Sequence, residues 1–537
     1  MVASRALPSR NWPAGSAGCA RSSRLAFAAA AAGGALYALG FVGFGVWPLA
    51  LVAWVPLWSA LDALRARGAG AADLAAAGLA FGAAAYALGY GWLWRLVAVF
   101  LGGDALAGAA LFAGHGVWFA AGFALQAWLY GAARARGWPV ALAGVAPLVA
   151  TEWLYPALFP LRLGYALVGQ PLFAQTAELG GPLLLSAQLG LANAAALEGL
   201  RLLRAGRAPR AGERGAGSER RAALATLGAA ALAAAGVAAF GAARTSELED
   251  AIAAAPALRV GIVQANVGVL EKGRDPERVH RAHLEQTRAL LADESVDLVI
   301  WPETVYTRGI AGPLPVSGEL IRGEARVPLL FGAASVRTVG SERLVFNSAL
   351  LVDADGRIRS GYDKNLLVPF AETVPLAVLA PLFPHAQGFG AASGAPPLVL
   401  GPWRLATPIC FEAIDPAFVR RMAAEARPHA FVSLANDGWF GDSQEPAIHL
   451  AVASLRAVEH RRSLVRATNS GVSAVVDPLG RVVARSPLLA RDTLVASVPL
   501  LDGAPTLYGR AGDWPGALAA GAVALLGLPR RSRPSAP

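Results

Sequence analysis

The sequence predicts two kinds of structure in one chain, a multi-span α-helical membrane domain followed by a soluble α/β domain. Of the 537 residues, 55% are hydrophobic and only 16% are charged, and the mean hydropathy is +0.46, which is unusual for a soluble protein of this size. The apolar excess is concentrated before residue 245, in Ala-, Leu- and Gly-rich sequence with few acids. Residues 256–500 have instead the mixed composition of a soluble domain.

The membrane domain is predicted from apolar runs that each approach the ~20 residues needed for a bilayer-spanning helix. Seven runs lie near residues 25–43, 46–63, 73–100, 105–131, 138–159, 178–200 and 222–243, and an eighth lies near 514–529. Further spans follow the first run directly, so it is not a simple cleaved signal peptide. We therefore expect an N-terminal segment over 1–24, a membrane domain of about seven transmembrane helices over 25–245, a soluble domain over 256–500, a C-terminal transmembrane helix over 513–530 and a tail over 531–537.

The orientation of these spans is predicted from arginine, because basic residues in short loops tend to stay in the cytoplasm. Alternate connections are rich in arginine, whereas those near 44, 102 and 160–175 carry almost none. The arginines before the first span and after the second, fourth, sixth and eighth are Arg5, Arg10, Arg21, Arg24, Arg65, Arg67, Arg134, Arg136, Arg201, Arg204, Arg207, Arg210, Arg214, Arg220, Arg221, Arg530, Arg531 and Arg533. The N-terminal segment and the tail are thus expected to be cytoplasmic, and residues 256–500 to lie outside.

Loop arginines also account for the formal net charge of +10 without a nucleic-acid partner. The two cysteines, Cys19 and Cys410, lie in different surroundings and do not indicate a disulfide framework. Four polar side chains lie within or beside predicted spans, and such residues indicate function unless they snorkel to an interface or pair with one another. Both explanations stay open for these residues, which are Arg95, His115, Glu152 and Arg162.

The soluble domain is predicted to contain a mixed sheet, because short apolar runs alternate with helical patterns and hairpin turns. Helices are expected over 276–292 and 446–460. The predicted strands are 260–267, 298–302, 327–332, 345–352, 356–362, 398–400, 403–409, 430–435, 464–476 and 482–484.

Three reactive residue types each follow the end of a predicted strand, namely Glu303, Lys364 and Cys410. Adjacent strand ends at one edge of a sheet converge in space, so we expect these side chains to meet there. A neighbouring cation favours the thiolate of cysteine, and a carboxylate base can take the thiol proton. The Lys364 ammonium, with the backbone N–H that follows Cys410, would also stabilise an oxyanion.

Each of the three residues also has an ordinary structural explanation. Cys410 can be a small buried hydrophobe, Glu303 a helix cap and Lys364 an exposed turn residue. Lysine usage favours chemistry at Lys364, because only two of the 47 basic residues are lysine. The argument is weakened by the other lysine, Lys272, for which the sequence offers no comparable role.

Five motifs occur in order along the domain: Trp301-Pro-Glu303, Lys364 to Glu372, Ile409-Cys-Phe-Glu412, Asn436 to Gly441 and Arg466 to Ser473. The first three resemble the Glu–Lys–Cys signatures of the nitrilase (carbon–nitrogen hydrolase) superfamily, and the last two are similar to its later motifs. Together with the preceding spans, the chain resembles the bacterial apolipoprotein N-acyltransferases over essentially its full length.

This resemblance implies that residues 256–500 form a nitrilase-like α-β-β-α sandwich with Glu303 as general base, Lys364 as transition-state stabiliser and Cys410 as nucleophile. It also implies that Glu372 and Glu412 support the site by orienting Lys364 and the cysteine loop. The expected location is the bacterial inner membrane, as a multi-pass protein whose catalytic domain faces the periplasm.

The resemblance further implies ping-pong transfer of a fatty acyl chain from a phospholipid, through a Cys410 thioester, to a diacylglyceryl-modified lipoprotein. Neither a cofactor nor a metal is expected. One alternative is a membrane-anchored nitrilase-type amidase acting on a small nitrogen compound, although eight spans exceed what an anchor needs. Another is a transporter or scaffold with an inactive enzyme domain.

The sequence departs from the family pattern in four places. Phe411 replaces a common tyrosine, Ala371 replaces a glycine before Glu372, and Gly273 lies where a tryptophan is frequent. The loop 158–164 also lacks a tryptophan after its proline. These departures affect details of substrate contact and leave the three reactive residues intact.

Overall fold

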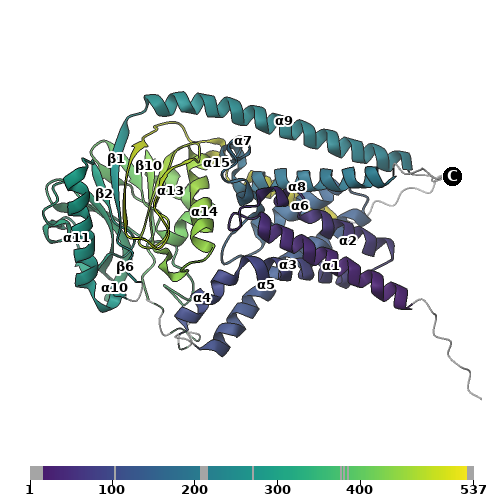
Figure 1. The fold of residues 1–537 in the computed structure, drawn as a ribbon, viewed down its shortest axis with the longest axis horizontal. Coiled ribbons are helices and arrows are strands. Elements are labelled where there is room, and N and C mark those ends of the chain that lie inside the picture. Colours follow the sequence, from purple (N-terminus) through teal and green to yellow (C-terminus); the bar gives the residue numbers. More distant parts are fainter. Residues whose placement is uncertain are drawn as a thin grey trace, which may run out of the picture.

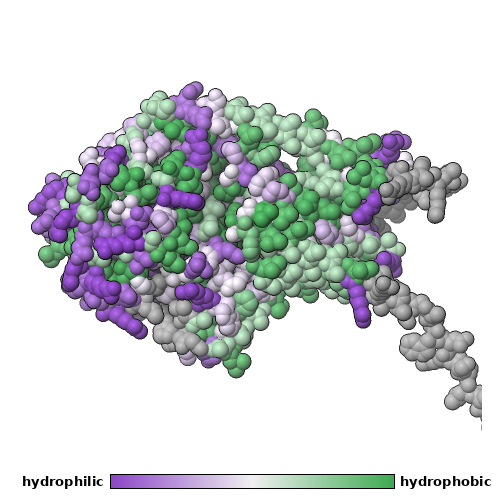
Figure 2. All heavy atoms as spheres, in the orientation of Figure 1, coloured by the Kyte–Doolittle hydropathy of each residue, from purple (hydrophilic) through white to green (hydrophobic). Residues whose placement is uncertain are grey.

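The computed structural model describes residues 16–101, 104–205, 216–268, 271–374 and 388–528, together with residues 378, 381, 383 and 386. The predicted segment before residue 16, the arginines at 207, 210, 214 and 530, and the tail 531–537 lie outside this range. Figure 1 shows a helical half and an α/β half arranged along the long axis of the molecule. Hydrophobic residues gather over the helical half in Figure 2, whereas hydrophilic residues cover much of the α/β half.

The helical half contains a helix over each predicted apolar run. Five helical stretches of the described chain are long and apolar enough to cross a membrane, namely 47–66, 71–89, 105–135, 177–205 and 217–254. The helices are α1 (Ser16–Gly40), α2 (Trp54–Ala66), α3 (Ala71–Gly89), α4 (Gly91–Phe100), α5 (Ala105–Ala135), α6 (Val140–Leu154), α8 (Ala177–Ala205), α9 (Ala216–Ala254) and α16 (Trp514–Ala524). The run 73–100 is therefore two helices, because α3 ends at Gly89, with Tyr90 as its C-cap, and α4 begins at Gly91.

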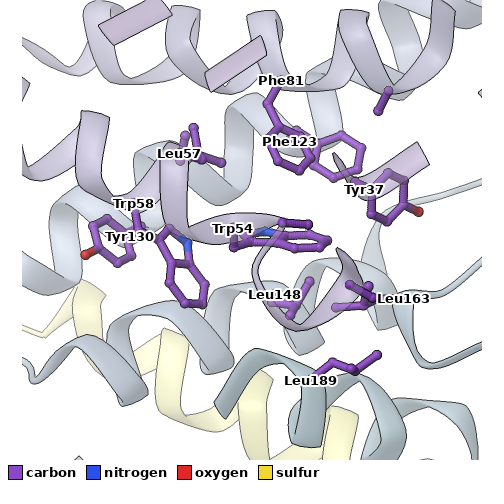
Figure 3. Packing of buried hydrophobic residues seen from close by; sticks show 14 of the residues in the cluster. Tyr37, Trp54, Leu57, Trp58, Phe81, Phe123, Tyr130, Leu148, Leu163 and Leu189 are labelled. Atoms are coloured by element: carbon purple, nitrogen blue, oxygen red, sulfur yellow. The ribbon is translucent and has the colours of Figure 1, made fainter. Parts of the chain in front are cut away.

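Small residues and aromatic rings hold these helices together. A Cβ at Gly34 of α1 would lie 2.0 Å from the carbonyl oxygen of Phe81 on α3, so glycine permits the close approach of these helices. Figure 3 shows the rings that fill the centre of the bundle, where Trp54 lies 5.2 Å from Phe81 and Phe81 lies 5.0 Å from Phe123 between ring centroids. The Trp54 backbone N–H donates to Asn193 Oδ1 of α8 at 2.8 Å, so a polar contact also joins the helices.

The α/β half contains two sheets packed face to face. The first has the order β14-β1-β2-β5-β6-β7-β4, with β3 beside β5, and the second has the order β13-β12-β11-β10-β9-β8. The strands of the first sheet are β1 (Ala257–Gln264), β2 (Leu298–Ile300), β3 (Tyr306–Ala311), β4 (Val316–Ser317), β5 (Leu329–Val339), β6 (Glu342–Val352), β7 (Arg357–Asp363) and β14 (Asp492–Pro499). Those of the second are β8 (Leu398–Leu400), β9 (Trp403–Ala406), β10 (Ala430–Ala435), β11 (Ser463–Thr468), β12 (Ala474–Val476) and β13 (Val482–Arg485).

Helices cover both outer faces, so the predicted α-β-β-α sandwich is confirmed. Side chains of both sheets form one buried core that includes Ile262, Ile300, Phe431 and Leu464. Helix α11 (Pro276–Asp293) covers the first sheet through a second core, and α13 (Pro416–Ala426) and α14 (Glu445–His460) cover the second sheet. This is the two-sheet arrangement with one helical layer on each side (Figure 1).

One predicted strand is wrong in its extent. The run 464–476 forms two antiparallel strands, β11 and β12, because the chain reverses between Thr468 and Ala474. The reversal is built from polar contacts inside an otherwise apolar run. The Ser473 hydroxyl donates to Gln264 Oε1 at 2.7 Å, and the Thr468 hydroxyl donates to the same oxygen at 3.2 Å.

Helix α14 joins the two halves. Its Ala453 and Ala457 pack into the sandwich core, whereas Ile448, Val452 and Leu455 pack into the core of the helical bundle. Apolar residues on two sides are typical of a buried helix that is covered on both faces. The loop that follows β9 and carries Cys410 contacts α14, where His449 Nε2 lies 3.2 Å from the Cys410 carbonyl oxygen, and its Phe411 and Ile414 pack in the core of the helical bundle. These contacts fix the position of the candidate site.

Candidate active site

The three reactive residues come from two facing sheets, and not from one sheet edge as predicted. Glu303 follows β2 and Lys364 follows β7 in the first sheet, whereas Cys410 follows β9 in the second sheet and begins the 3₁₀ helix η4 (Cys410–Ile414). The three residues could be predicted from the sequence because each follows an apolar run. Their placement on one sheet edge is wrong because the sequence does not state which strands share a sheet.

Lys364 is held between two carboxylates. Its Nζ lies 2.8 Å from Glu372 Oε2 and 3.4 Å from Glu303 Oε1, and the lysine is fully buried. Burial alone would lower the pKa of Lys364, but the charges of Glu372 and Glu303 outweigh burial and raise it. Lys364 is therefore an ammonium ion fixed at the base of the site.

Asn347 is a member of this cluster that sequence reasoning missed. The residue lies on β6, and its Nδ2 donates to Glu303 Oε1 at 2.7 Å and to Glu372 Oε1 at 2.9 Å. One amide thus bridges the two carboxylates that flank Lys364. No local signal marks Asn347, because it lies inside a strand and its partners come from distant turns.

Cys410 lies in a turn with left-handed backbone geometry. Its φ is +52°, a region that few residues other than glycine adopt, and such values occur at sites where the surrounding structure fixes the chain. Burial and the negative charge of Glu303 raise the pKa of the Cys410 thiol, and Lys364 only partly opposes them. The resting sulfur is therefore a neutral thiol, so attack on a substrate requires a base.

Glu412 connects the cysteine loop to the lysine segment. Its Oε2 accepts the N–H of Ile409 at 2.8 Å, and its Oε1 accepts the N–H of Asn365 at 2.6 Å and the Tyr362 hydroxyl at 2.7 Å. Burial raises the pKa of Glu412 to about 7, opposed by Lys364 and by these hydrogen bonds. The side chain thus joins the strand ends of the two sheets.

Lys272 also lies in the site. Its Nζ donates to the backbone carbonyl of Glu303 at 2.8 Å, and Thr307 Oγ1 donates to the Lys272 carbonyl at 3.4 Å. The residue is buried, and burial lowers the pKa of Lys272 to about 8, opposed by the charge of Glu303. Both lysines of the chain therefore lie against Glu303, and the rarity of lysine was a signal for Lys272 as well as for Lys364.

An apolar cavity lies in the helical half near the cysteine loop. It has a volume of about 280 Å³, and its lining includes Phe159, Glu152, His115 and Arg162. The Phe159 ring lies 6.1 Å from the ring of Phe411, the residue after the cysteine. Phe159, which forms part of the cavity wall, therefore contacts the cysteine loop through Phe411.

The polar residues predicted within the spans have specific surroundings. Glu152 Oε1 accepts the N–H of Leu163 at 2.8 Å, and Arg162 Nη1 lies 3.7 Å from Asp513 Oδ1. The Arg95 guanidinium of α4 lies against Gly441, where a Cβ would come within 2.3 Å of it. Arg95 thus contacts the soluble domain, whereas Glu152, Arg162 and His115 face the cavity.

Within the described chain, the carboxylates and imidazole of Asp437, Glu445 and His449 lie close enough to share a metal ion. Arg466 Nη2 donates to Asp437 Oδ2 at 2.6 Å, however, and His449 Nε2 faces the Cys410 carbonyl at 3.2 Å. A guanidinium bound to the same carboxylate repels a cation, so these residues do not fit a metal site.

Comparisons with known proteins cover both halves of the chain. Residues 33–195 match the model of the apolipoprotein N-acyltransferase N-terminal domain, and residues 259–506 match that of carbon-nitrogen hydrolase. The chain is 34% identical to an apolipoprotein N-acyltransferase of Azotobacter vinelandii, over 95% of this chain and 96% of that protein. It belongs to the apolipoprotein N-acyltransferase family. A second member, from Pseudomonas syringae pv. tomato, is 30% identical over 90% of this chain and 93% of its own length.

Membership of the apolipoprotein N-acyltransferase family confirms the predicted nitrilase-superfamily assignment and the pairing of a membrane domain with this sandwich. Among solved structures, an amidase from Nesterenkonia sp. is 21% identical over 45% of this chain and 90% of its own, with a TM-score of 0.33. Nit3 of Saccharomyces cerevisiae is 16% identical over 45% of this chain and 90% of its own, with a TM-score of 0.36. Both matches cover less than half of this chain.

Proposed function

We propose that this chain is an N-acyltransferase that moves a fatty acyl chain from a membrane phospholipid to the α-amine of the diacylglyceryl-modified N-terminal cysteine of an apolipoprotein. The observation that carries the proposal is the buried Glu303–Lys364–Glu372 cluster beside Cys410, whose loop contacts the wall of an apolar cavity of the helical half through Phe411 and Phe159. Family membership supports the same conclusion.

The first step is acylation of Cys410. The thiol proton passes to Glu303 as Sγ attacks the ester carbonyl of the phospholipid, so a C–S bond forms and the carbonyl oxygen becomes an oxyanion. The Lys364 ammonium and the backbone N–H of Phe411 are the donors that stabilise this oxyanion. The C–O bond then breaks, and Glu303 returns the proton to the oxygen of the departing lysophospholipid.

The second step transfers the acyl chain to the amine. The free amine of the lipoprotein attacks the thioester carbon, and Glu303 takes one amine proton as the C–N bond forms. The C–S bond breaks, and the proton returns from Glu303 to the sulfur. Because one site serves both substrates in turn, the kinetics are ping-pong.

Four residues have supporting roles in this proposal. Glu372 orients Lys364, Asn347 holds Glu303 and Glu372 in register, and Glu412 fixes the cysteine loop. Phe411 brings the loop against Phe159 at the cavity. A lipid tail in the cavity would thus place its ester near Sγ, so both the apolar lining and the membrane helices have a purpose in the reaction.

A transfer assay tests the proposed function. We expect the purified chain, given phosphatidylethanolamine and a diacylglyceryl lipopeptide with a free amine, to yield the N-acylated lipopeptide and lysophospholipid in equal amounts. The Cys410→Ser variant should yield neither. Ammonia released from a simple amide, with no acylation of the lipopeptide, would instead establish the amidase alternative.

The catalytic domain is proposed to face the periplasm from the bacterial inner membrane, because loop arginines place the predicted cytoplasmic connections on the opposite side. Cysteine labelling tests this orientation in a Cys19→Ser, Cys410→Ala background. Arg281 of α11 and Arg67 after α2 are both exposed. A membrane-impermeant maleimide should label Arg281→Cys in intact spheroplasts but label Arg67→Cys only after lysis, and the reverse pattern would contradict the orientation.

A further inference from the structure

Behind the cysteine loop, a chain of buried polar side chains ends on the backbone of the nucleophile. Arg466 lies on β11, Asp437 follows β10 in the 3₁₀ helix η5 (Asp437–Trp439), and His449 lies on α14. Arg466 Nη2 donates to Asp437 Oδ2 at 2.6 Å, Asp437 Oδ1 lies 3.1 Å from His449 Nδ1, and His449 Nε2 lies 3.2 Å from the carbonyl oxygen of Cys410. All three side chains are almost fully buried.

Both atoms that face the imidazole of His449 are hydrogen-bond acceptors. Arg466 and His449 hold the pKa of Asp437 below its usual range although burial opposes them, so its carboxylate is ionised. A neutral ring has one N–H and satisfies one acceptor, whereas a protonated ring donates to both. Glu445 Oε1 lies 3.8 Å from Nδ1, and its Oε2 has no hydrogen-bond partner among the described residues. A second carboxyl group therefore lies beside the ring, outside hydrogen-bond distance of Nδ1.

The Cys410 carbonyl belongs to the same peptide group as the N–H of Phe411. A donor on the carbonyl oxygen of a peptide group polarises it and makes its N–H a stronger donor. In the proposed mechanism, that N–H stabilises the oxyanion at the thioester-forming carbon. The chain from Arg466 through Asp437 and His449 thus ends on the peptide group whose N–H faces the developing negative charge.

We propose that Arg466, Asp437 and His449 form a buried relay that strengthens the oxyanion donor of Phe411 by hydrogen bonding to the carbonyl of Cys410. His449 is the positioning residue of this relay, because it does not touch the substrate and acts through the peptide group. The same hydrogen bond holds the left-handed turn at Cys410 in place. This inference rests on the proposed function, since it assumes that Cys410 forms an acyl thioester.

A matched pair of variants separates the two ends of the imidazole. In His449→Gln the side-chain amide reaches the position of Nε2 and can still donate to the Cys410 carbonyl. In His449→Asn the amide reaches only the position of Nδ1, so it can contact Asp437 but not the carbonyl. The two variants make similar changes in a buried site, and they differ in the contact that the relay requires.

Two rates are to be measured on each purified variant: single-turnover thioester formation with phosphatidylethanolamine, and alkylation of Cys410 by iodoacetamide, which needs no oxyanion. We expect His449→Asn to slow thioester formation about tenfold, a fraction of the 10²–10³ lost with a whole oxyanion donor, while alkylation changes less than about threefold. His449→Gln should retain thioester formation within about threefold of the unsubstituted chain.

Three results would overturn the relay. Equal rates of thioester formation in the two variants would show that the carbonyl contact is not used. A parallel loss of alkylation in His449→Asn would show that the turn had moved, and that the effect did not pass through the oxyanion donor. Absence of any thioester on the unsubstituted chain would refute the proposed function itself, and that result is seen before any variant is compared.

Discussion

At the scale of single residues, the charges around Glu303 determine how readily the Cys410 thiol can lose its proton. Lys364 lies between two carboxylates, Glu303 and Glu372, so these three groups carry one excess negative charge when all are ionised. Lys272 lies on the backbone of Glu303 and supplies the compensating positive charge. In the proposed mechanism, a proton passes from Cys410 to Glu303, and the two ammonium groups then balance the thiolate and Glu372, which favours the thiolate in a buried site.

Lys272 should therefore set a pH limit on acylation. Its pKa of about 8 means that the ammonium is present below pH 8 and lost above it. We expect thioester formation by the unsubstituted chain to decline above about pH 8, and Lys272→Arg to move this decline to higher pH because guanidinium stays charged. Lys272→Met should be slower by about tenfold below pH 8, equivalent to about 1.4 kcal/mol.

The measurement is the pH profile of single-turnover acylation for the three proteins, with thermal unfolding of each as a control for folding. Superimposable profiles for Lys272→Met and the unsubstituted chain would show that the ammonium has no part in the reaction.

The residues that could be predicted from the sequence are those whose signal is local. Glu303, Lys364 and Cys410 each follow an apolar run, and the structure brings them close together. Asn347 and His449 could not be predicted in this way, because their contacts depend on strand pairing and on the packing of α14. Lys272 carries only a compositional signal, since nothing near it in sequence indicates burial against Glu303.

At the scale of secondary-structure elements, the turn of Glu303 rests directly on strand β5. The Gly332 N–H donates to the Pro302 carbonyl at 3.1 Å, and the Val305 N–H donates to the Gly332 carbonyl at 2.8 Å. A Cβ at Gly332 would lie 2.5 Å from Pro302 O and 2.6 Å from the Cα of Glu303. Glycine at this position therefore lets the turn approach the sheet closely enough to aim the carboxylate at Lys364.

Gly332→Ala is thus expected to displace Glu303 and slow acylation by about 10²-fold, because misplacement of a catalytic group by ~1 Å costs that much. Overpacking should also lower the stability by about 1–3 kcal/mol. The matched control is Gly503→Ala, since the nearest atom to a Cβ there, Arg462 Nη1, is 3.9 Å away. Single-turnover rates and thermal unfolding distinguish the two, and an active Gly332→Ala variant would contradict this account of the turn.

The strands were predicted well where apolar runs are bounded by turn residues, as in β7 and β10. They were predicted poorly where polar residues inside an apolar run make a reversal. Between Thr468 and Ala474 the chain turns because Gln264 of the opposite sheet binds the two hydroxyls there, and a tertiary contact of this kind leaves no local pattern. Placement of the reactive residues on two sheets was missed for the same reason.

At the scale of the whole molecule, the two halves are joined through the C-terminal end of α14. Arg461 Nε lies 2.6 Å from Glu178 Oε2 of α8, and its Nη1 donates to Gln175 Oε1 at 2.7 Å. All three side chains are buried. Figure 1 shows α14 on the side of the α/β half that faces the helical half. The contact fixes the soluble domain on the membrane helices, so Phe411 of the cysteine loop is held against Phe159 in the cavity wall.

Removing this arginine should loosen the junction. We expect Arg461→Ala to destabilise the protein by about 3–5 kcal/mol, because it leaves a buried carboxylate with one partner fewer. Arg288→Ala is the control, since its ion pair with Glu324 is largely exposed and worth at most about 1 kcal/mol. Thermal unfolding in detergent should show a clearly lower midpoint for Arg461→Ala, and equal midpoints for the two variants would contradict a structural role for the contact.

The central claim, that Cys410 is the nucleophile that accepts an acyl chain from a phospholipid, is tested most directly by mass spectrometry of the protein after incubation with phosphatidylethanolamine alone. The account predicts an added acyl mass on the peptide that carries Cys410, removable by hydroxylamine as a thioester is, and absent from Cys410→Ala. It also predicts that Glu303→Gln forms the adduct at least 10²-fold more slowly, because the neutral thiol then lacks its base. An acyl adduct that persists in Cys410→Ala, or no adduct on the unsubstituted chain, would contradict it.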